Sequence, residues 1–214
     1  MLFPAGGRTK VELIPTQHEL RALLRETGAL RKGHFAYPSG LHSEEYVQVA
    51  LAMRYYQHAK LLSVALSRKL RANAEIRALI PELSIVAPAT GGLPVAYGVC
   101  EALRAHQVYW GEREETGQPM RFRQYLELVK GEQVLLVDDI LRSGRRLTEL
   151  KKLVEANGAE VVGLAVMIYQ PNPGTADFGS LPFFHLVQLD SMYYRDEASC
   201  DLCKNNIPLE KVWI

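Results

Sequence analysis

The spacing of apolar residues along the chain predicts alternating helices and strands. In several stretches apolar residues recur every three or four positions, which is the period of an amphipathic helix packed on a core. Between them lie short, nearly continuous apolar runs, which are typical of strands buried on both faces of a sheet. The predicted helices span residues 16–30, 58–74, 94–105 and 144–158. The predicted strands span residues 83–92, 107–114, 132–139, 159–169 and 182–190.

Local signals mark where some of these elements begin and end. Thr16 is placed to cap the first helix, and Pro94 is expected in the first turn of the third, where proline is tolerated. Gly158 is a stop signal for the fourth helix. Residues 33–49 are expected to form two short extended pieces around a glycine-containing turn. Residues 116–128 are expected to form a polar loop that enters a weak strand.

The order of these elements predicts an α/β fold. Apolar strands that alternate with helices form a mostly parallel central sheet, flanked by helices on both faces. In such sheets ligands collect at the carboxyl ends of the strands. Two glycine turns, at residues 90–92 and 142–144, each follow a predicted strand. We therefore expect both turns at the same edge of the sheet, as parts of one binding site.

Composition narrows the class of protein. The chain has 214 residues, 48% of them hydrophobic, which suits a single globular domain over residues 1–214. A formal net charge of +1 provides no overall attraction for nucleic acid or acidic membranes. The predicted strands and helices are too short to span a bilayer, and the start of the chain lacks a signal-peptide core. The cysteine count of 3 argues against a disulfide framework, so we expect a reduced, cytoplasmic protein.

The stretch VLLVDDILRSGRRLTEL, residues 134–150, contains the main candidate chemistry. Its apolar run leads into Asp138 and Asp139, and a short turn at residues 142–144 precedes a predicted helix. The N-terminus of a helix attracts phosphate, whereas two carboxylates repel it and suit sugar hydroxyls or a metal ion. A helix N-terminus and an acid pair so close in sequence therefore indicate that the ligand is a phosphorylated sugar. The alternative is that the two aspartates only cap a strand–helix turn.

This stretch resembles the phosphoribosylpyrophosphate (PRPP) motif of type I phosphoribosyltransferases. In that motif an apolar strand, two acids and two apolar residues precede a turn rich in hydroxyls and glycine. Other segments, in the same order along the chain, resemble a bacterial orotate phosphoribosyltransferase branch. They are GHFAYPSGLHSEEYVQVAL (33–51), VAPATGGLPVAYGVCEAL (86–103), WGERE (110–114), CDLC (200–203) and IPLEK (207–211).

The resemblance implies a fold and a reaction. The type I fold has a mostly parallel central sheet flanked by helices, with a small hood formed here by about residues 1–50 and 185–214. The implied reaction transfers ribose 5-phosphate from PRPP to orotate, giving orotidine 5′-monophosphate and pyrophosphate, in a homodimer with Mg²⁺ accompanying PRPP. Two alternatives stay open: a phosphoribosyltransferase for a different base, and a non-catalytic regulator that binds PRPP or a nucleotide.

The resemblance also implies roles for individual residues. Catalytic roles are expected for Asp138, Asp139 and Arg113. The 5′-phosphate of PRPP is expected to contact Arg142, Ser143, Gly144, Arg145 and Arg146. The pyrophosphate is expected to contact Ala89, Thr90, Gly91 and Gly92, together with Arg121 and Arg123 from a mobile loop that often serves the partner subunit. The base is expected near Ser39, His42 and Tyr46.

The sequence departs from the family pattern at several of these places. Residues 142–146 carry three arginines where hydroxyls are usual, so Arg145 and Arg146 either bind phosphate or extend into solvent as solvated charges. Arg113 either closes over pyrophosphate or pairs with a neighbouring glutamate. A lysine that often serves orotate is replaced by Pro38, and a second basic residue expected near 169 is replaced by Tyr169 and Gln170, so no carboxylate partner is evident.

Two of the three cysteines have the spacing of half a zinc site. Cys200 and Cys203 are separated by two residues, but Cys100 lies in an apolar predicted helix and does not supply a second pair. We assign no protein-held metal from the sequence. The alternatives for this pair are a zinc site completed by histidines brought near by folding, and a conformational clasp of the C-terminal tail.

Overall fold

The computed structural model describes residues 14–115 and 117–212. Residues 1–13 lie outside the described residues. They include most of the N-terminal stretch that we expect to lack a signal peptide. Within the described ranges, no helix is long and apolar enough to cross a membrane.

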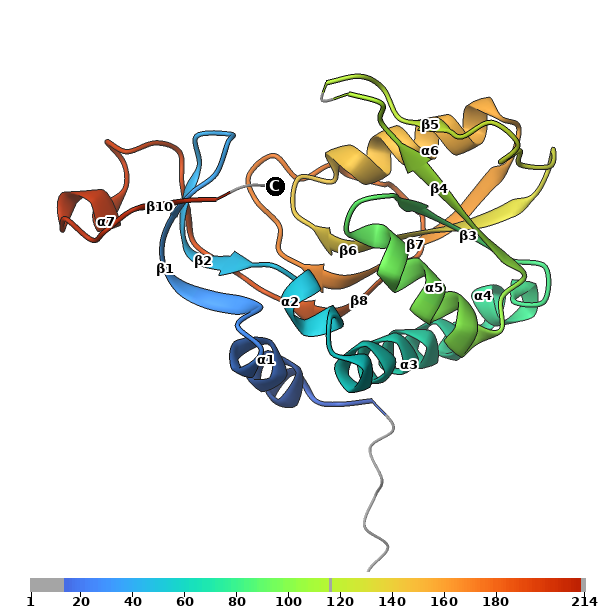
Figure 1. Ribbon diagram of the computed structural model, residues 1–214, viewed down its shortest axis with the longest axis horizontal. Helices are drawn as coiled ribbons and strands as arrows, with labels where there is room; N and C mark the ends of the chain where they lie inside the picture. Colours follow the sequence, from blue (N-terminus) through green and yellow to red (C-terminus); the bar gives the residue numbers. More distant parts are fainter. Residues whose placement is uncertain (1–13, 116, 213–214) are drawn as a thin grey trace, which may run out of the picture.

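A six-stranded sheet forms the centre of the molecule, with the strand order β5-β4-β3-β6-β7-β8 (Figure 1). All neighbouring strands run parallel except the edge strand β5, which is antiparallel to β4. The predicted parallel sheet is therefore confirmed. Its strands are β3 (Ser84–Pro88), β4 (Gln107–Glu112), β5 (Arg121–Phe122), β6 (Gln133–Leu141), β7 (Glu160–Tyr169) and β8 (Phe183–Gln188).

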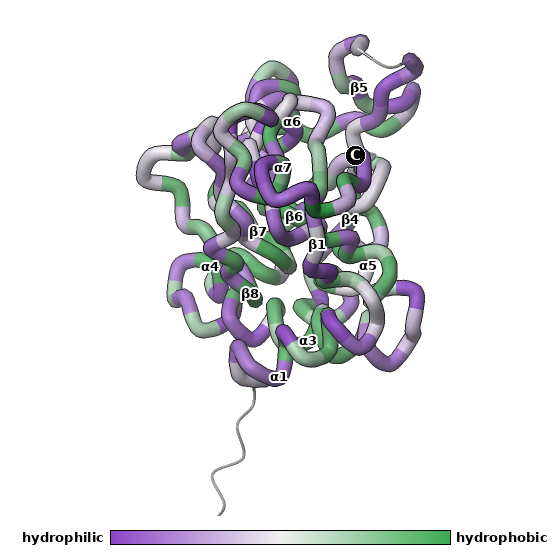
Figure 2. Tube along the Cα trace, turned by 90° about the vertical axis from the view of Figure 1, so that its left-hand side faces the viewer, coloured by the Kyte–Doolittle hydropathy of each residue, from purple (hydrophilic) through white to green (hydrophobic). Residues whose placement is uncertain are grey.

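Helices cover both faces of this sheet. Figure 1 shows α3 and α5 together on one face and α6 on the other. Each face has its own cluster of buried apolar side chains, and Figure 2 shows hydrophobic residues concentrated along β7, β8 and α5. The helices are α1 (Gln17–Glu26), α2 (Ala50–Met53), α3 (Tyr56–Ala72), α4 (Ala74–Leu79), α5 (Gly92–Leu103), α6 (Arg145–Ala156) and α7 (Asp201–Lys204).

Most predicted boundaries hold to within a few residues. Thr16 caps α1 in a reciprocal capping box with Glu19, as its position predicted. The short helices α2 and α4 were not predicted. Within the described residues 117–128 of the predicted loop, the regular structure is the two-residue strand β5. The strand β6 runs on to Leu141 rather than ending at the two acids, because it keeps pairing with β7 to that point.

A second, smaller sheet forms a hood beside the main body (Figure 1). Its strand order is β10-β1-β2-β9, so it joins segments from both ends of the described chain. The antiparallel pair β1 and β2 confirms the two extended pieces that were predicted around a turn. Residues 185–188, which we expected to contribute to the hood, belong to β8 of the large sheet. The hood strands are β1 (Leu30–Ala36), β2 (His42–Val47), β9 (Tyr193–Tyr194) and β10 (Glu210–Lys211).

The strand order identifies where a ligand is expected. From β3 the chain moves to its neighbour β4 on one side, and then crosses to β6 on the other side of β3. Such a reversal opens a crevice between the carboxyl ends of the two strands. Pairing between β3 and β6 ends at Val86 with Leu136, and β6 continues beyond it. The crevice that this strand order predicts between β3 and β6 would therefore lie beside the two acids.

Candidate active site

Asp138 and Asp139 lie in the last part of β6, at the predicted edge of the sheet. They are buried, with 1% and 9% of their surfaces exposed. The turn after β3 lies against them. A Cβ atom placed on Gly91 would come 2.9 Å from Asp139 Oδ2, and one placed on Gly92 would come 3.1 Å from Asp138 Oδ1. The acid pair and the first glycine turn therefore meet, at the shared edge of the sheet where the sequence predicted both glycine turns.

The carboxyl group of Asp138 is held in an unfavourable environment for a charge. Burial raises its pKa well above the ordinary value, and the adjacent Asp139 carboxylate raises it further, while Arg146 acts in the opposite direction. Its Oδ1 accepts a 2.8 Å hydrogen bond from the backbone N–H of Asp139, which keeps the side chain oriented. A buried acid pair with a perturbed pKa is a common feature of functional sites.

This environment predicts a pH dependence of stability. Because the folded protein binds the Asp138 proton more tightly than the unfolded chain does, the associated stabilisation is present below the unfolded pKa of about 3.9. It is lost as pH rises through the higher folded pKa. Asp138→Asn is expected to remove this loss, so the variant should gain stability relative to wild type as pH rises above the unfolded pKa. Urea unfolding of ligand-free protein measures the difference, with the exposed Asp190→Asn as control. Parallel pH profiles for wild type and Asp138→Asn would contradict the prediction.

The second glycine turn leads directly into α6. Gly144 caps α6 with a φ of 73°, a conformation that favours glycine, and a Cβ there would come 3.1 Å from both Ala176 and Phe178. The segment that follows β7 supports the turn from behind: Ala176 N–H donates to the Ser143 carbonyl at 2.9 Å. The hydroxyl of Thr175 donates to the Arg142 carbonyl at 2.5 Å. Sequence reasoning missed this support, because nothing local pairs residues 175–176 with the turn.

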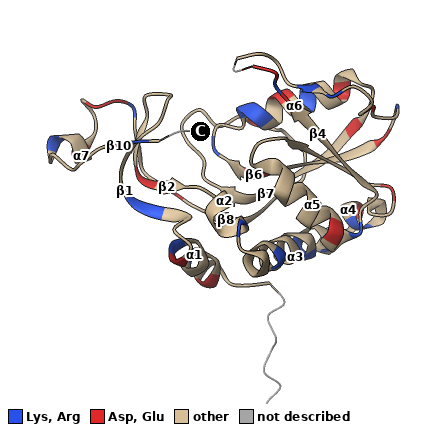
Figure 3. Cartoon of the chain, in the orientation of Figure 1, with Lys and Arg blue, Asp and Glu red and all other residues tan. Residues whose placement is uncertain are grey.

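The two arginines at the start of α6 take different directions. Arg145 is exposed, in agreement with the solvated alternative. Arg146 instead reaches the acid pair: its Nε lies 3.6 Å from Asp138 Oδ2, and its Nη2 lies 3.5 Å from Asp139 Oδ1. It also donates a 3.0 Å hydrogen bond to the Thr90 carbonyl in the first glycine turn. Figure 3 shows this basic start of α6 in blue, at the end of the helix nearer the hood.

The guanidinium of Arg142 extends away from the turn and into the hood. Its Nε donates to Gln170 Oε1 at 2.9 Å, and its Nη2 donates to the Val47 carbonyl at 2.6 Å. It lies 5.5 Å from the ring centre of Tyr37 and 5.7 Å from that of Tyr46. The structure therefore places this cation among the hood aromatics rather than beside the turn where its backbone lies.

The residues expected near the base are separated from one another. Tyr46 lies beside Arg142, packed against Phe35 and Tyr37. Ser39 is exposed in the turn between β1 and β2. The ring of His42 instead contacts His34 and Cys203. The additional aromatic Tyr37 was not selected from the sequence, where an aromatic in a strand is more often ordinary packing.

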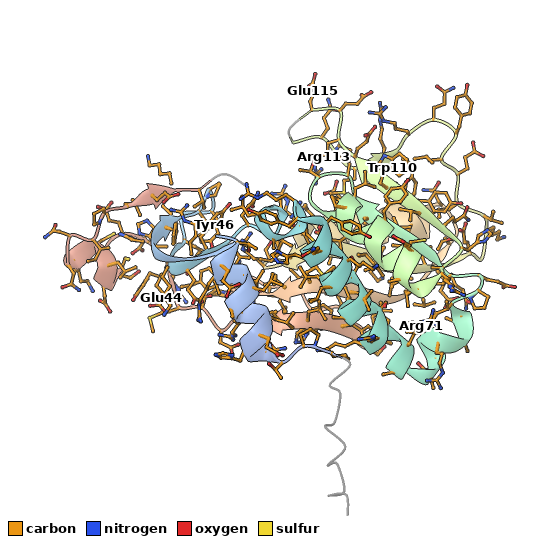
Figure 4. The ribbon with its side chains drawn as sticks, turned by 60° about the horizontal axis from the view of Figure 1, so that its bottom comes forward. Glu44, Tyr46, Arg71, Trp110, Arg113 and Glu115 are labelled. Carbon is orange, nitrogen blue, oxygen red and sulfur yellow. The ribbon has the colours of Figure 1, made fainter. Side chains whose placement is uncertain are left out.

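The arginines of the projecting loop are all paired with glutamates. Arg113 forms a two-pronged ion pair with Glu149 of α6, rather than with a glutamate next to it in sequence. Arg121 pairs with Glu114 and Arg123 pairs with Glu112. Figure 4 shows Arg113 and Glu115 on this loop, above and to the right of the hood residue Tyr46.

The architecture and the crevice define a class of protein, and comparisons with known proteins agree. Residues 64–177 match the phosphoribosyl transferase domain family, a span that includes both glycine turns and the acid pair. The chain belongs to the phosphoribosyltransferase family. The type I fold expected from the sequence is thereby confirmed.

Relatives and solved structures within this family are similar over most of the chain. A protein of Carboxydothermus hydrogenoformans named orotate phosphoribosyltransferase is 36% identical over 193 residues, which cover 90% of this chain and 95% of that protein. A protein of the same name from Thermotoga maritima is 33% identical over 192 residues, covering 90% and 96%. The crystal structure of orotate phosphoribosyltransferase from Aeropyrum pernix has a TM-score of 0.63 at 20% identity, covering 79% of this chain and 93% of that one, and supports the fold.

Proposed function

We propose that this protein transfers the ribose 5-phosphate of PRPP to orotate, releasing pyrophosphate and forming orotidine 5′-monophosphate. The observation that carries the proposal is the meeting of the acid pair with the first glycine turn at the switch point of the sheet. The names of the similar proteins from several bacteria support the choice of orotate.

The crevice suits each part of PRPP. The carboxylates of Asp138 and Asp139 accept hydrogen bonds from the ribose hydroxyls, for which charged acceptors are strong partners. The 5′-phosphate lies at the N-terminus of α6, against the turn that contains Ser143 and Gly144, where backbone N–H groups lack helical partners. The pyrophosphate lies along the turn at residues 89–92, where Gly91 and Gly92 allow close approach of the backbone.

The donor set also fits Mg²⁺ carried by PRPP. Carboxylate oxygens are the protein ligands that Mg²⁺ takes, and those of Asp138 and Asp139 converge on the first glycine turn. A bound Mg²⁺ would neutralise part of the charge that accumulates on pyrophosphate as it leaves.

Arg146 is proposed to change partners when PRPP binds. Without ligand it balances the two carboxylates that the sugar needs, at distances that are longer than tight ion pairs. The pyrophosphate group offers a stronger, more highly charged partner beside Thr90, which Arg146 already contacts. Moving there would free the carboxylates for the ribose and stabilise the departing pyrophosphate.

Arg142 is proposed to bind the carboxylate of orotate. A guanidinium has about five N–H donors. In Arg142, two of them are occupied by the hydrogen bonds to Gln170 and Val47, which also hold the guanidinium plane in one orientation. The rings of Tyr37 and Tyr46 flank it and provide an apolar surface for a planar base. Arg142 therefore supplies, from the turn, the cation that the sequence lacked at positions 38 and 170.

The loop arginines and the assembly complete the proposal. When the loop closes over the site of a partner subunit, three loop arginines would exchange their glutamate partners for pyrophosphate. They are Arg113, Arg121 and Arg123. Closure of the loop would exclude water during the transfer. The protein would act as a homodimer in the cytoplasm, as the family resemblance implies.

A direct assay tests the proposed reaction. Purified protein is mixed with PRPP, Mg²⁺ and one base at a time, including orotate, uracil and adenine, and pyrophosphate release is followed. Turnover with orotate supports the proposal, and turnover only with another base replaces it with a different phosphoribosyltransferase. The contacts of Arg146 with both acids favour a second candidate, a regulator that binds PRPP without catalysis. PRPP binding without any turnover would select that candidate.

A further inference from the structure

Four side chains in the hood lie close together, and none of them belongs to the acid pair or to the two glycine turns. They are His34, His42, Cys200 and Cys203, and one potential ligand atom from each lies within 4.8 Å of all the others. The contacting residues are far apart in sequence: His34 and Cys200 are separated by 166 positions, and His42 and Cys203 by 161. From this cluster we propose a structural zinc site that fastens the C-terminal tail to the hood, independently of the proposed reaction.

The spacing of the ligand atoms matches a tetrahedron around zinc. His34 Nε2 lies 3.0 Å from His42 Nδ1 and 3.5 Å from the Sγ atoms of Cys200 and Cys203. Cys203 Sγ lies 3.3 Å from His42 Nδ1. With bonds of about 2.3 Å to sulfur and about 2.0 Å to nitrogen, a tetrahedral ion separates two nitrogens by about 3.3 Å and nitrogen from sulfur by about 3.5 Å. The four measured edges agree with these values to within a few tenths of an ångström.

The orientation of His34 is also that of a metal ligand. Its Nδ1 lies 2.9 Å from the Ile207 carbonyl, which only accepts, so this nitrogen carries the proton and donates. In neutral His34 the lone pair is therefore on Nε2, the atom that faces the cluster. Metal-bound histidines commonly donate their second N–H to a carbonyl in this way.

Burial and ligand type favour a closed structural site. His34, His42 and Cys200 are 2%, 7% and 0% exposed. Two thiolates and two imidazoles are a complete ligand set for structural zinc, whereas catalytic zinc keeps an open position. The irregular pairing of β1 with β2 between Lys32 and Phe35 is a bulge that contains His34, and bulges commonly redirect a side chain in this way.

The C-terminal tail has little regular structure of its own to hold it against the hood. The helix α7 has only 4 residues, and β10 pairs with β1 at only two positions, Phe35 with Glu210 and Ala36 with Lys211. Helices this short are unstable without tertiary contacts. Cys200 caps α7 and Cys203 lies within it, so a bound ion would connect both to the hairpin of β1 and β2. Figure 1 shows α7 at the outer end of the hood.

The first experiment needs only the wild-type protein. Full-length protein is equilibrated with Zn²⁺, dialysed exhaustively and analysed by elemental mass spectrometry, with about one Zn²⁺ per chain expected. Replacement of zinc by Co²⁺ is expected to give intense visible bands of tetrahedral cobalt together with thiolate charge-transfer absorption. The alternative is a metal-free cluster in which His42 Nδ1–H donates to His34 Nε2. Failure to retain zinc, together with no tetrahedral cobalt spectrum, would select that alternative and overturn the proposal.

The second experiment locates the metal. Cys200→Ser combined with Cys203→Ser is expected to abolish retention of zinc, while Cys100→Ser is the matched control and should keep about one Zn²⁺ per chain, because Cys100 lies in α5. A strong chelator is expected to lower the Tm of wild type and of Cys100→Ser, and to leave that of the double variant unchanged. Full zinc retention by the double variant would place the metal elsewhere and refute the site.

Discussion

Asp138→Asn combined with Asp139→Asn is expected to lower kcat/KM for PRPP by at least about 100-fold, or roughly 3 kcal/mol. Each carboxylate would be replaced by an amide that accepts hydrogen bonds from sugar hydroxyls more weakly. The loss should also appear in the PRPP dissociation constant, measured by calorimetry without a base. Because the change removes like charges from a buried pair, the variant is expected to remain folded.

The opposite outcome has a clear physical meaning. The two carboxylates also repel the phosphates of PRPP, so tighter binding by the double variant would show that repulsion outweighs their contacts with ribose. Either unchanged or tighter PRPP binding would contradict the assigned role. The exposed Asp190→Asn provides a matched change of charge outside the crevice, and its PRPP affinity should equal that of wild type.

Arg142→Ala is expected to raise KM for orotate by about 100-fold, with a much smaller effect on KM for PRPP. A charge-assisted, two-pronged contact with a carboxylate in a partly buried site contributes on the order of 2–3 kcal/mol. A base without a carboxylate, such as uracil, should lose little, so discrimination between orotate and uracil should fall. Arg142→Lys is expected to restore only part of the effect, because an ammonium group cannot reproduce the planar contacts.

The same variant separates two roles for Arg142. The family resemblance assigned it to the 5′-phosphate, whereas its guanidinium lies among the hood aromatics. A rise in KM for PRPP with orotate binding unaffected would favour the phosphate role. Arg145→Ala is the matched control, because Arg145 is exposed in the first turn of α6, and its KM for orotate should not change.

Local patterns in the sequence were sufficient to predict the large sheet and the strand ends that meet beside the acid pair. The apolar runs before residues 89 and 138 predicted β3 and β6, and parallel strands bring their carboxyl ends to one edge. That rule placed the first glycine turn and the acid pair at one edge, and the pairing of β3 with β6 brings Gly91 and Gly92 against Asp138 and Asp139. The ends of β6 and of the loop near β5 were less well predicted, because pairing with a neighbouring strand determines where such elements stop.

What the sequence by itself determined, then, is the alternation of strands and helices, the family and the residues that come together at the strand ends. Each of these follows from residues near one another in the chain, or from a regular sheet that orders them. Only the tertiary structure decided that Arg146 reaches the acids, that Arg142 enters the hood and that His34 and His42 meet the two cysteines. The physical reason is that the direction of a side chain and the contacts between distant segments depend on how the whole chain packs, which no local sequence pattern determines.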